Sequence, residues 1–175
     1  SQVWKYREDI RKMHKLQEQY LFLARHNIHS AEELVGTIAS LTDKKKETSA
    51  EKSRIYKARE RSRELFTAAD EMENLKPAEQ SYRLGDTFFE DEHRKWVALE
   101  QELQAQGYAL EEVQALRRHY KEEYSEVCAK EKVVFRELNT GKAILNSMIP
   151  DSFSDGRKTE YNREIIRDRK EQPVR

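Results

Sequence analysis

The sequence contains few of the residues that cross-link chains or interrupt helices. Among 175 residues there are one cysteine, three prolines and five glycines. The single cysteine, Cys128, excludes an internal disulfide framework and suits a reducing compartment, so we expect a cytoplasmic protein. No apolar run approaches the roughly 18 residues that a membrane span needs, and no signal peptide is recognisable. The chain begins Ser1-Gln2-Val3-Trp4, without an initiator methionine, which suggests a fragment or a processed product.

Net charge is also lacking. Lys and Arg together number 33, and so do Asp and Glu. The whole chain therefore has no overall attraction to nucleic acid or to membranes, and only local clusters of charge can matter. Apolar residues make up 37% of the chain and charged residues 38%, which is a poor composition for a thick globular core. Long helices that share narrow apolar seams suit this composition better.

Helical periodicity runs through most of the chain. It predicts helices over residues 3–25, 31–75, 86–106 and 110–147. Ser30 and Glu33 have the spacing of a capping box at the start of the second helix. The apolar stripe of that helix fades over residues 42–54, where the helix either continues straight or bends or melts. Pro77 is predicted to mark a boundary, followed by a short helical piece to Leu84.

Together these elements predict an all-α protein. We expect an elongated, coiled-coil-like antiparallel bundle of three or four long helices over residues 1–149, because short links favour antiparallel neighbours. Gly107 falls where a left-handed helix end is expected. Residues 150–175 are polar and predict a mobile tail with at most one short helix. Some aromatic residues could mark a docking surface but are more often core at this spacing; they are Trp4, Phe88, Phe89 and Trp96.

Residues with catalytic or metal-binding potential are scattered. Glu90 and His93 have the spacing of a metal-binding pair in di-iron bundles, but that site needs a second such pair and two further carboxylates. His26 and His29 lack a third ligand and are more often polar residues at a helix end. No phosphate-binding loop, dinucleotide-binding glycine pattern, nucleophile elbow or paired-cysteine zinc motif is present. We therefore expect neither enzyme activity nor a metal or cofactor site.

The strongest local charge asymmetry lies between residues 44 and 63, where nine basic residues meet three acidic ones. The nine are candidates for nucleic-acid binding: Lys44, Lys45, Lys46, Lys52, Arg54, Lys57, Arg59, Arg61 and Arg63. Lys45, Lys52 and Arg59 recur every seven residues and share a helix face that could track phosphates, with Tyr56 available for stacking. The alternative is a solvated face balanced by acidic neighbours and by an acidic partner helix.

Several segments also resemble a known protein family. The most recognisable are Met72-Glu73-Asn74-Leu75, Tyr82-Arg83-Leu84-Gly85-Asp86-Thr87-Phe88-Phe89, Gln106-Gly107-Tyr108, Tyr56-Lys57-Ala58-Arg59 and Arg136-Glu137-Leu138-Asn139. With Trp96 and Leu116-Arg117, they resemble the helical C-terminal region of conjugative relaxases, the mobilisation nucleases of plasmids and integrative elements. The resemblance covers roughly residues 55–148.

This resemblance implies an accessory part of a larger protein. Relaxases nick one DNA strand in an N-terminal domain, with a tyrosine nucleophile and a metal held by a histidine cluster. Nothing in this sequence matches that cluster, so no catalytic residue is carried over. The implied function is a non-catalytic helical module that contacts DNA or docks relaxosome or coupling proteins in conjugative transfer. The alternative is a structural coiled-coil scaffold that self-associates, as a homo-oligomer, and has no nucleic-acid role.

Overall fold

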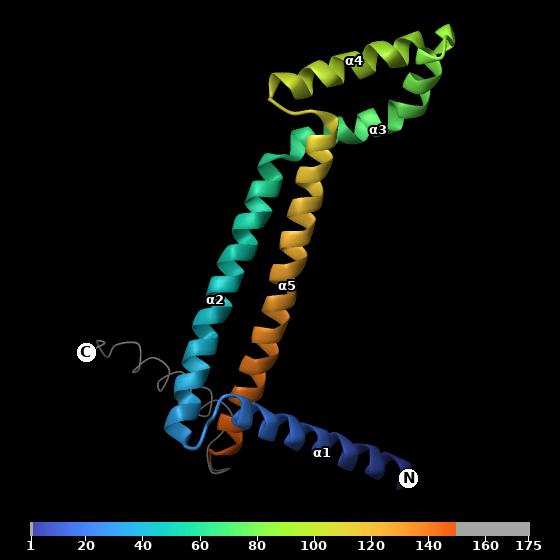
Figure 1. Cartoon of the computed structure of the whole chain (residues 1–175). Helices are drawn as coiled ribbons and strands as arrows, with labels where there is room; N and C mark the ends of the chain where they lie inside the picture. The colour runs from blue at the N-terminus through green and yellow to red at the C-terminus, as the bar shows by residue number, and fades with distance from the viewer. Residues whose placement is uncertain (1, 150–175) are drawn as a thin grey trace, which may run out of the picture. The chain divides into compact units, whose positions relative to one another are not determined.

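The computed structural model describes residues 2–149, and the regular structure within this range is entirely helical, as predicted. The elements are α1 (Gln2–Arg25), α2 (Ala31–Arg61), α3 (Arg63–Arg83), the 3-10 turn η1 (Thr87–Phe89), α4 (Glu90–Ala105) and α5 (Leu110–Ser147) (Figure 1). No helix in residues 2–149 combines the length and hydropathy needed to cross a membrane. The predicted tail, residues 150–175, lies outside the described residues.

Local capping signals place several helix ends where the sequence predicts them. The backbone N–H of Glu33 donates to Ser30 Oγ at 3.2 Å, and Glu33 Oε2 accepts from the N–H of His29 at 2.7 Å. This confirms a capping interaction at the start of α2. After α4, Gly107 has a φ of +85°, and the N–H of Tyr108 donates to the carbonyl of Leu103 at 3.0 Å. The predicted left-handed helix end is therefore confirmed.

The second predicted helix is wrong in its extent. It spans two helices, because α2 ends at Arg61 and α3 begins at Arg63. Between them, Ser62 Oγ donates to the carbonyl of Ala58 at 3.3 Å. Such bonds from a serine to the preceding turn compete with regular helix geometry and bend the chain. Residues 42–54, where the apolar stripe fades, are nevertheless helical throughout.

The boundary predicted at Pro77 is also wrong. Pro77 lies inside α3, which continues to Arg83. Proline removes one N–H donor and crowds the carbonyl four residues earlier, so it bends a helix without necessarily ending it. α3 is visibly bent in Figure 1. The helix ends at Arg83, just before Gly85, whose φ is +103°, and the side chain of Asp86 then accepts from the N–H of Phe88.

The chain divides into two compact units. Unit 1 comprises Ser1–Ser49 with Lys130–Arg175, and unit 2 comprises Ala50–Ala129. α2 and α5 each contribute residues to both units.

The core of unit 1 is formed where the end of α1, the first half of α2 and the last part of α5 meet. Its buried residues are Phe22, Ile28, Leu34, Val35, Ile38, Leu41, Leu138, Ile144 and Leu145. Gly141 of α5 lies against this core: a Cβ at this position would be 3.0 Å from Phe22 Cζ and 3.1 Å from Ile38 Cγ1. Glycine therefore fits this close approach without a shift of Phe22 or Ile38.

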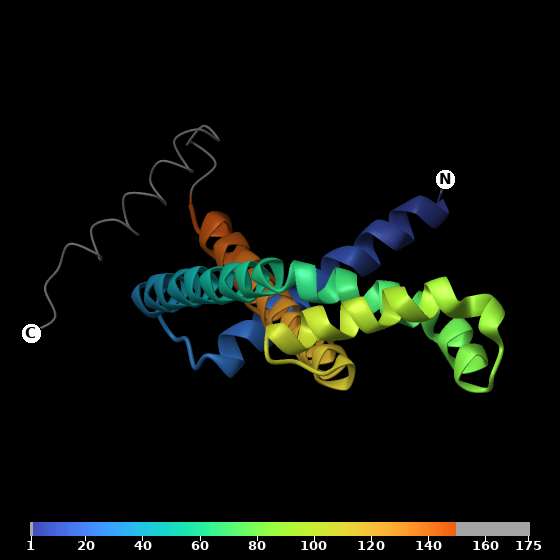
Figure 2. The same ribbon diagram turned by 90° about the horizontal axis from the view of Figure 1, so that it is seen from above.

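The core of unit 2 forms between α3, α4 and the start of α5. Its buried residues are Leu65, Phe66, Ala68, Ala69, Met72, Trp96, Leu103 and Val113. α3 and α4 lie side by side and are joined by the turn at Gly85, as both views of the chain show (Figures 1 and 2). The burial of Trp96 confirms its prediction as a core residue.

Three of the four aromatic residues expected in a core are not buried. Phe88 is 82% exposed, Trp4 is exposed and Phe89 is half-buried. Phe88 and Phe89 lie in the 3-10 turn before α4, where their rings pack edge to face at a centroid distance of 5.1 Å. Both therefore lie outside the apolar stripe of α4 that carries Trp96, which explains why helical spacing alone gave the wrong prediction.

Candidate nucleic-acid interface

The nine predicted nucleic-acid-binding residues lie on α2 and at the start of α3. Seven of them are exposed: Lys44, Lys46, Arg54, Lys57, Arg59, Arg61 and Arg63. The other two, Lys45 and Lys52, are half-buried. Exposure therefore leaves most of the predicted set accessible to a ligand.

Lys45 and Lys52 contact aromatic rings of α5. Lys45 Nζ lies 5.1 Å from the ring centre of Phe135, and Lys52 Nζ lies 5.9 Å from that of Tyr124. Cations over ring faces are held by the quadrupole of the ring. The seven-residue repeat that contains these lysines thus follows the side of α2 that faces α5. A continuous row of basic side chains without partners in residues 2–149 therefore lies on another side of α2.

A second set of basic residues forms this row. Arg54, Lys57 and Arg61 follow one another at steps of three and four residues, which places them on one side of α2. All three are exposed, and within residues 2–149 their side chains form no ion pair or hydrogen bond. We call these three residues the basic face. It lies entirely within unit 2.

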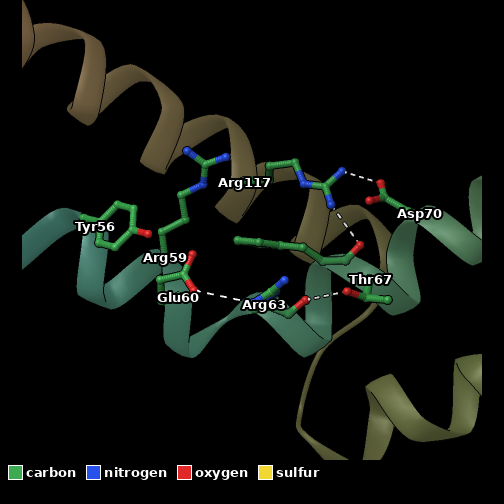
Figure 3. Close-up of a pocket in the computed structure, with 8 residues that line it drawn as sticks. Tyr56, Arg59, Glu60, Arg63, Thr67, Asp70 and Arg117 are labelled. Carbon is green, nitrogen blue, oxygen red and sulfur yellow. Dashed lines mark hydrogen bonds and ion pairs between the residues drawn. The ribbon is translucent and has the colours of Figure 1, made fainter.

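An open hollow of about 640 Å³ lies in unit 2 on a different side of α2, and no residue of the basic face lines it. It is lined by Tyr56, Arg59, Glu60, Arg63, Phe66, Thr67, Asp70 and Arg117. In Figure 3, Arg59 from α2 and Arg117 from α5 extend over the same side of the hollow. The guanidinium groups of Arg59 on α2, Arg63 on α3 and Arg117 on α5 therefore border one concave surface.

Arg117 is the member of this site that the sequence analysis missed. Its Nη1 donates to Asp70 Oδ1 at 2.6 Å, and its Nη2 donates to the carbonyl of Phe66 at 2.8 Å. Its guanidinium also lies 5.0 Å from the ring centre of Phe66. These contacts fix the orientation of the group. No local pattern could reveal it, because Arg117 is 47 residues from Asp70 in the chain.

The Arg117 contact also determines the charge state of the hollow. The hydrogen bond from Arg117 lowers the pKa of Asp70, its slight burial raises it, and the charge of Arg117 lowers it further, so the pKa of Asp70 lies below its ordinary value. Asp70 is therefore ionised at neutral pH and neutralises Arg117. Arg63 approaches Glu60 only to 3.9 Å, and Arg59 has no ion pair within residues 2–149. Arg59 and Arg63 are thus the cations available to an anionic ligand.

Chemically, the hollow and the basic face suit phosphate and base recognition. Exposed guanidinium groups pair with phosphate oxygens, often in a bidentate manner. Tyr56 is 54% exposed at the rim of the hollow, where an unpaired base could stack on its ring.

The Glu90–His93 pair considered in the sequence is separated in the structure. Glu90 pairs with Arg94 at 2.8 Å. His93 Nδ1 instead lies 2.7 Å from Oε2 of the buried Glu79, and its ring stacks on Tyr82. Within residues 2–149, no group of three or more potential metal ligands gathers.

The two histidines at the end of α1 also have separate partners. His26 Nε2 lies 2.7 Å from Glu137 Oε2, whereas His29 Nε2 lies 2.8 Å from Asn27 Oδ1. They are not brought together as a ligand pair. Cys128 is a half-buried free thiol on α5.

No family model, curated protein or solved structure matches the chain. The relaxase resemblance therefore depends on the segments quoted from the sequence. The proposal for function therefore also depends on the geometry of unit 2.

Proposed function

We propose that the chain is a non-catalytic helical accessory module of a DNA-mobilisation protein of the relaxase type, and that it contacts DNA through the basic face of α2. The observation that carries the proposal is the exposure of Arg54, Lys57 and Arg61 on one side of a helix, where their side chains form no ion pair within residues 2–149. In this proposal, the long helices form an elongated antiparallel bundle that holds the DNA near a nuclease.

The dimensions of the basic face suit a nucleic-acid backbone. From Arg54 to Arg61, α2 rises by about 10 Å at 1.5 Å per residue. Successive charges on one DNA strand are separated by about 3.4 Å along the axis, so this length corresponds to roughly three phosphates. Three unpaired cations and three phosphates can therefore pair along one side of the helix.

The test is a titration of fluorescently labelled single- and double-stranded DNA with the full chain, followed by anisotropy at low salt. The triple variant Arg54→Glu, Lys57→Glu and Arg61→Glu should bind at least about tenfold more weakly, because three phosphate contacts become repulsions. A matched control changes Lys95, Arg118 and Lys121 to Glu. These residues are exposed in the same unit and give the same change in net charge. Equal losses in both variants, or no binding by the original chain, would contradict the proposal.

Tyr56 provides a second test that separates the two forms of DNA. Loss of a stacked base typically costs about 1–3 kcal/mol. Tyr56→Ala should therefore weaken the binding of single-stranded DNA about tenfold or more. The binding of duplex DNA should remain nearly unchanged. Equal effects on both forms would remove base stacking from the proposal.

A structural coiled-coil scaffold is the second candidate function. The observation that favours it is the apolar side of α1, which is exposed along most of its length. Absence of DNA binding in the titration would leave this candidate in place. Contacts with relaxosome or coupling proteins would then replace DNA contact as the proposed role within a mobilisation complex.

A further inference from the structure

α1 carries a regular heptad repeat. Its residues at the two seam positions of the heptad, a and d, alternate at steps of four and three over three heptads: Tyr6, Ile10, Met13, Gln17, Tyr20 and Ala24. A repeat of 3.5 residues, shorter than the 3.6 of a straight helix, is the signature of a helix that supercoils around another helix of the same repeat.

This seam is exposed within unit 1. Tyr6 and Met13 are each 69% exposed, Tyr20 is 72% exposed and Ile10 is 51% exposed. Apolar residues along an amphipathic helix are normally covered. A contiguous exposed apolar surface of this kind marks an interaction site.

α1 is anchored in unit 1 by its opposite side. Phe22, which is fully buried in the core of unit 1, occupies the outer heptad position f. Positions a and d lie on the other side of the helix from f. Arg25, at outer position b of α1, also makes an anchoring contact. Its Nη2 donates to Glu137 Oε1 at 2.5 Å. The anchoring contacts of α1 therefore leave the seam free.

The area and the placement of charge match a pair of identical helices. With the flanking Leu16 and Leu21, the exposed apolar area comes to roughly 700 Å² per helix, so that two helices would bury about 1,400 Å², the size of a stable interface. Arg11, Lys12 and Lys15 occupy outer positions, where they do not oppose pairing. In a parallel pair, Asp9 at flanking position g of one helix would face His14 at position e of the other helix.

We propose that α1 forms a two-stranded coiled coil with α1 of a second copy of this chain, parallel and in register. In this arrangement, Gln17 lies opposite its counterpart at an a position, where a polar residue specifies register at some cost in stability. The tyrosines and Met13 fill the neighbouring layers. The proposal does not depend on the basic face, and DNA binding can therefore succeed or fail independently of it.

The first test is the mass of the full chain in solution, measured by sedimentation over a concentration series. We expect a reversible transition from the monomer mass of 20.9 kDa to twice that value. Ile10→Glu with Met13→Glu should shift the transition to at least about tenfold higher concentration, because charges would enter the seam. Lys15→Glu is the matched control, since it makes the same change in net charge at an outer position. Circular dichroism verifies that each variant is folded.

The second test addresses orientation by disulfide trapping in a Cys128→Ser background. Gln17→Cys should form a cross-linked dimer under mild oxidation, whereas Lys15→Cys at an outer position should not. A monomer at every concentration, or a dimer that is indifferent to the Ile10 and Met13 changes, would overturn the proposal. In the first case, the occupant of the seam would be residues 150–175 of the same chain or a different protein. A dimer without the Gln17 cross-link would overturn the parallel register.

Discussion

Glu79 shows how a single buried charge can join two helices. Its side chain, on α3, is only 3% exposed. Arg83 Nε donates to Glu79 Oε1 at 2.6 Å, and His93 of α4 lies 2.7 Å from Oε2. Burial raises the pKa of Glu79, but the hydrogen bonds and charges of His93 and Arg83 outweigh it and hold the pKa below its ordinary value of 4.5. The carboxylate is therefore ionised and links α3 to α4 at neutral pH.

We expect Glu79→Gln to lower the free energy of unfolding by about 2 kcal/mol, because charge-assisted hydrogen bonds in a buried position are lost. Urea denaturation followed by circular dichroism measures this change. Glu90→Gln is the control, since the exposed Glu90–Arg94 pair should contribute less than about 1 kcal/mol. Equal effects of the two variants would show that burial of Glu79 adds nothing.

The same residue gives a prediction for pH. A carboxyl group whose folded-state pKa is lowered stabilises the protein above its unfolded-state value, and that stability is lost as the pH falls through the folded-state pKa. The stability difference between the original chain and Glu79→Gln should therefore be full near neutral pH and shrink below about pH 4.5. Denaturation midpoints measured across this range would reveal it. A difference that grows in acid would mean that the sign of the shift is wrong.

At the scale of elements, helix ends are determined by backbone conformation. Gly107, at the end of α4, has a φ of +85°, and a Cβ there would meet no other atom within 4 Å. Any penalty for a side chain at this position is therefore conformational. Gly107→Ala should lower the free energy of unfolding by about 1 kcal/mol, because alanine resists the left-handed region.

Thermal or urea unfolding measures the Gly107 effect. Gly107→Asn should cost less than alanine, since asparagine tolerates positive φ. Gln106→Ala is the neighbouring control, at an exposed position with a negative φ of −91°. If alanine were harmless at position 107, the connection between α4 and α5 could not depend on the left-handed turn.

For the whole molecule, the balance of 33 basic and 33 acidic residues makes any DNA binding local. The logarithm of the binding constant for duplex DNA should fall linearly with the logarithm of the salt concentration. The slope should be about −0.9 for each phosphate neutralised. The variant with Arg54, Lys57 and Arg61 changed to Glu should lower the magnitude of this slope by about 3. Anisotropy titrations at several salt concentrations give the slope. An unchanged slope would exclude these residues from phosphate contact.

Features that depend on near neighbours in the chain could be read from the sequence. The Ser30–Glu33 cap, the Gly107 turn and the bounds of α5 follow from propensities and hydrogen bonds that act within a few residues. The exposed Arg54, Lys57 and Arg61 also belonged to the predicted nucleic-acid set. The two errors in this class are opposite in kind: Pro77 lies inside α3 without ending it, whereas at Ser62 a helix predicted to be continuous is interrupted.

Features that depend on which helix faces which required the folded chain. Two examples are the ion pair of Arg117 with Asp70, which completes the hollow, and the Glu79–His93 link. A third example is the packing of Phe22 and Ile38 against Gly141. Periodicity shows that a helix has an apolar side, but only packing decides whether that side is buried, because the contacts that cover it come from residues distant in the chain. The apolar side of α1, which the fold leaves open, is the clearest case.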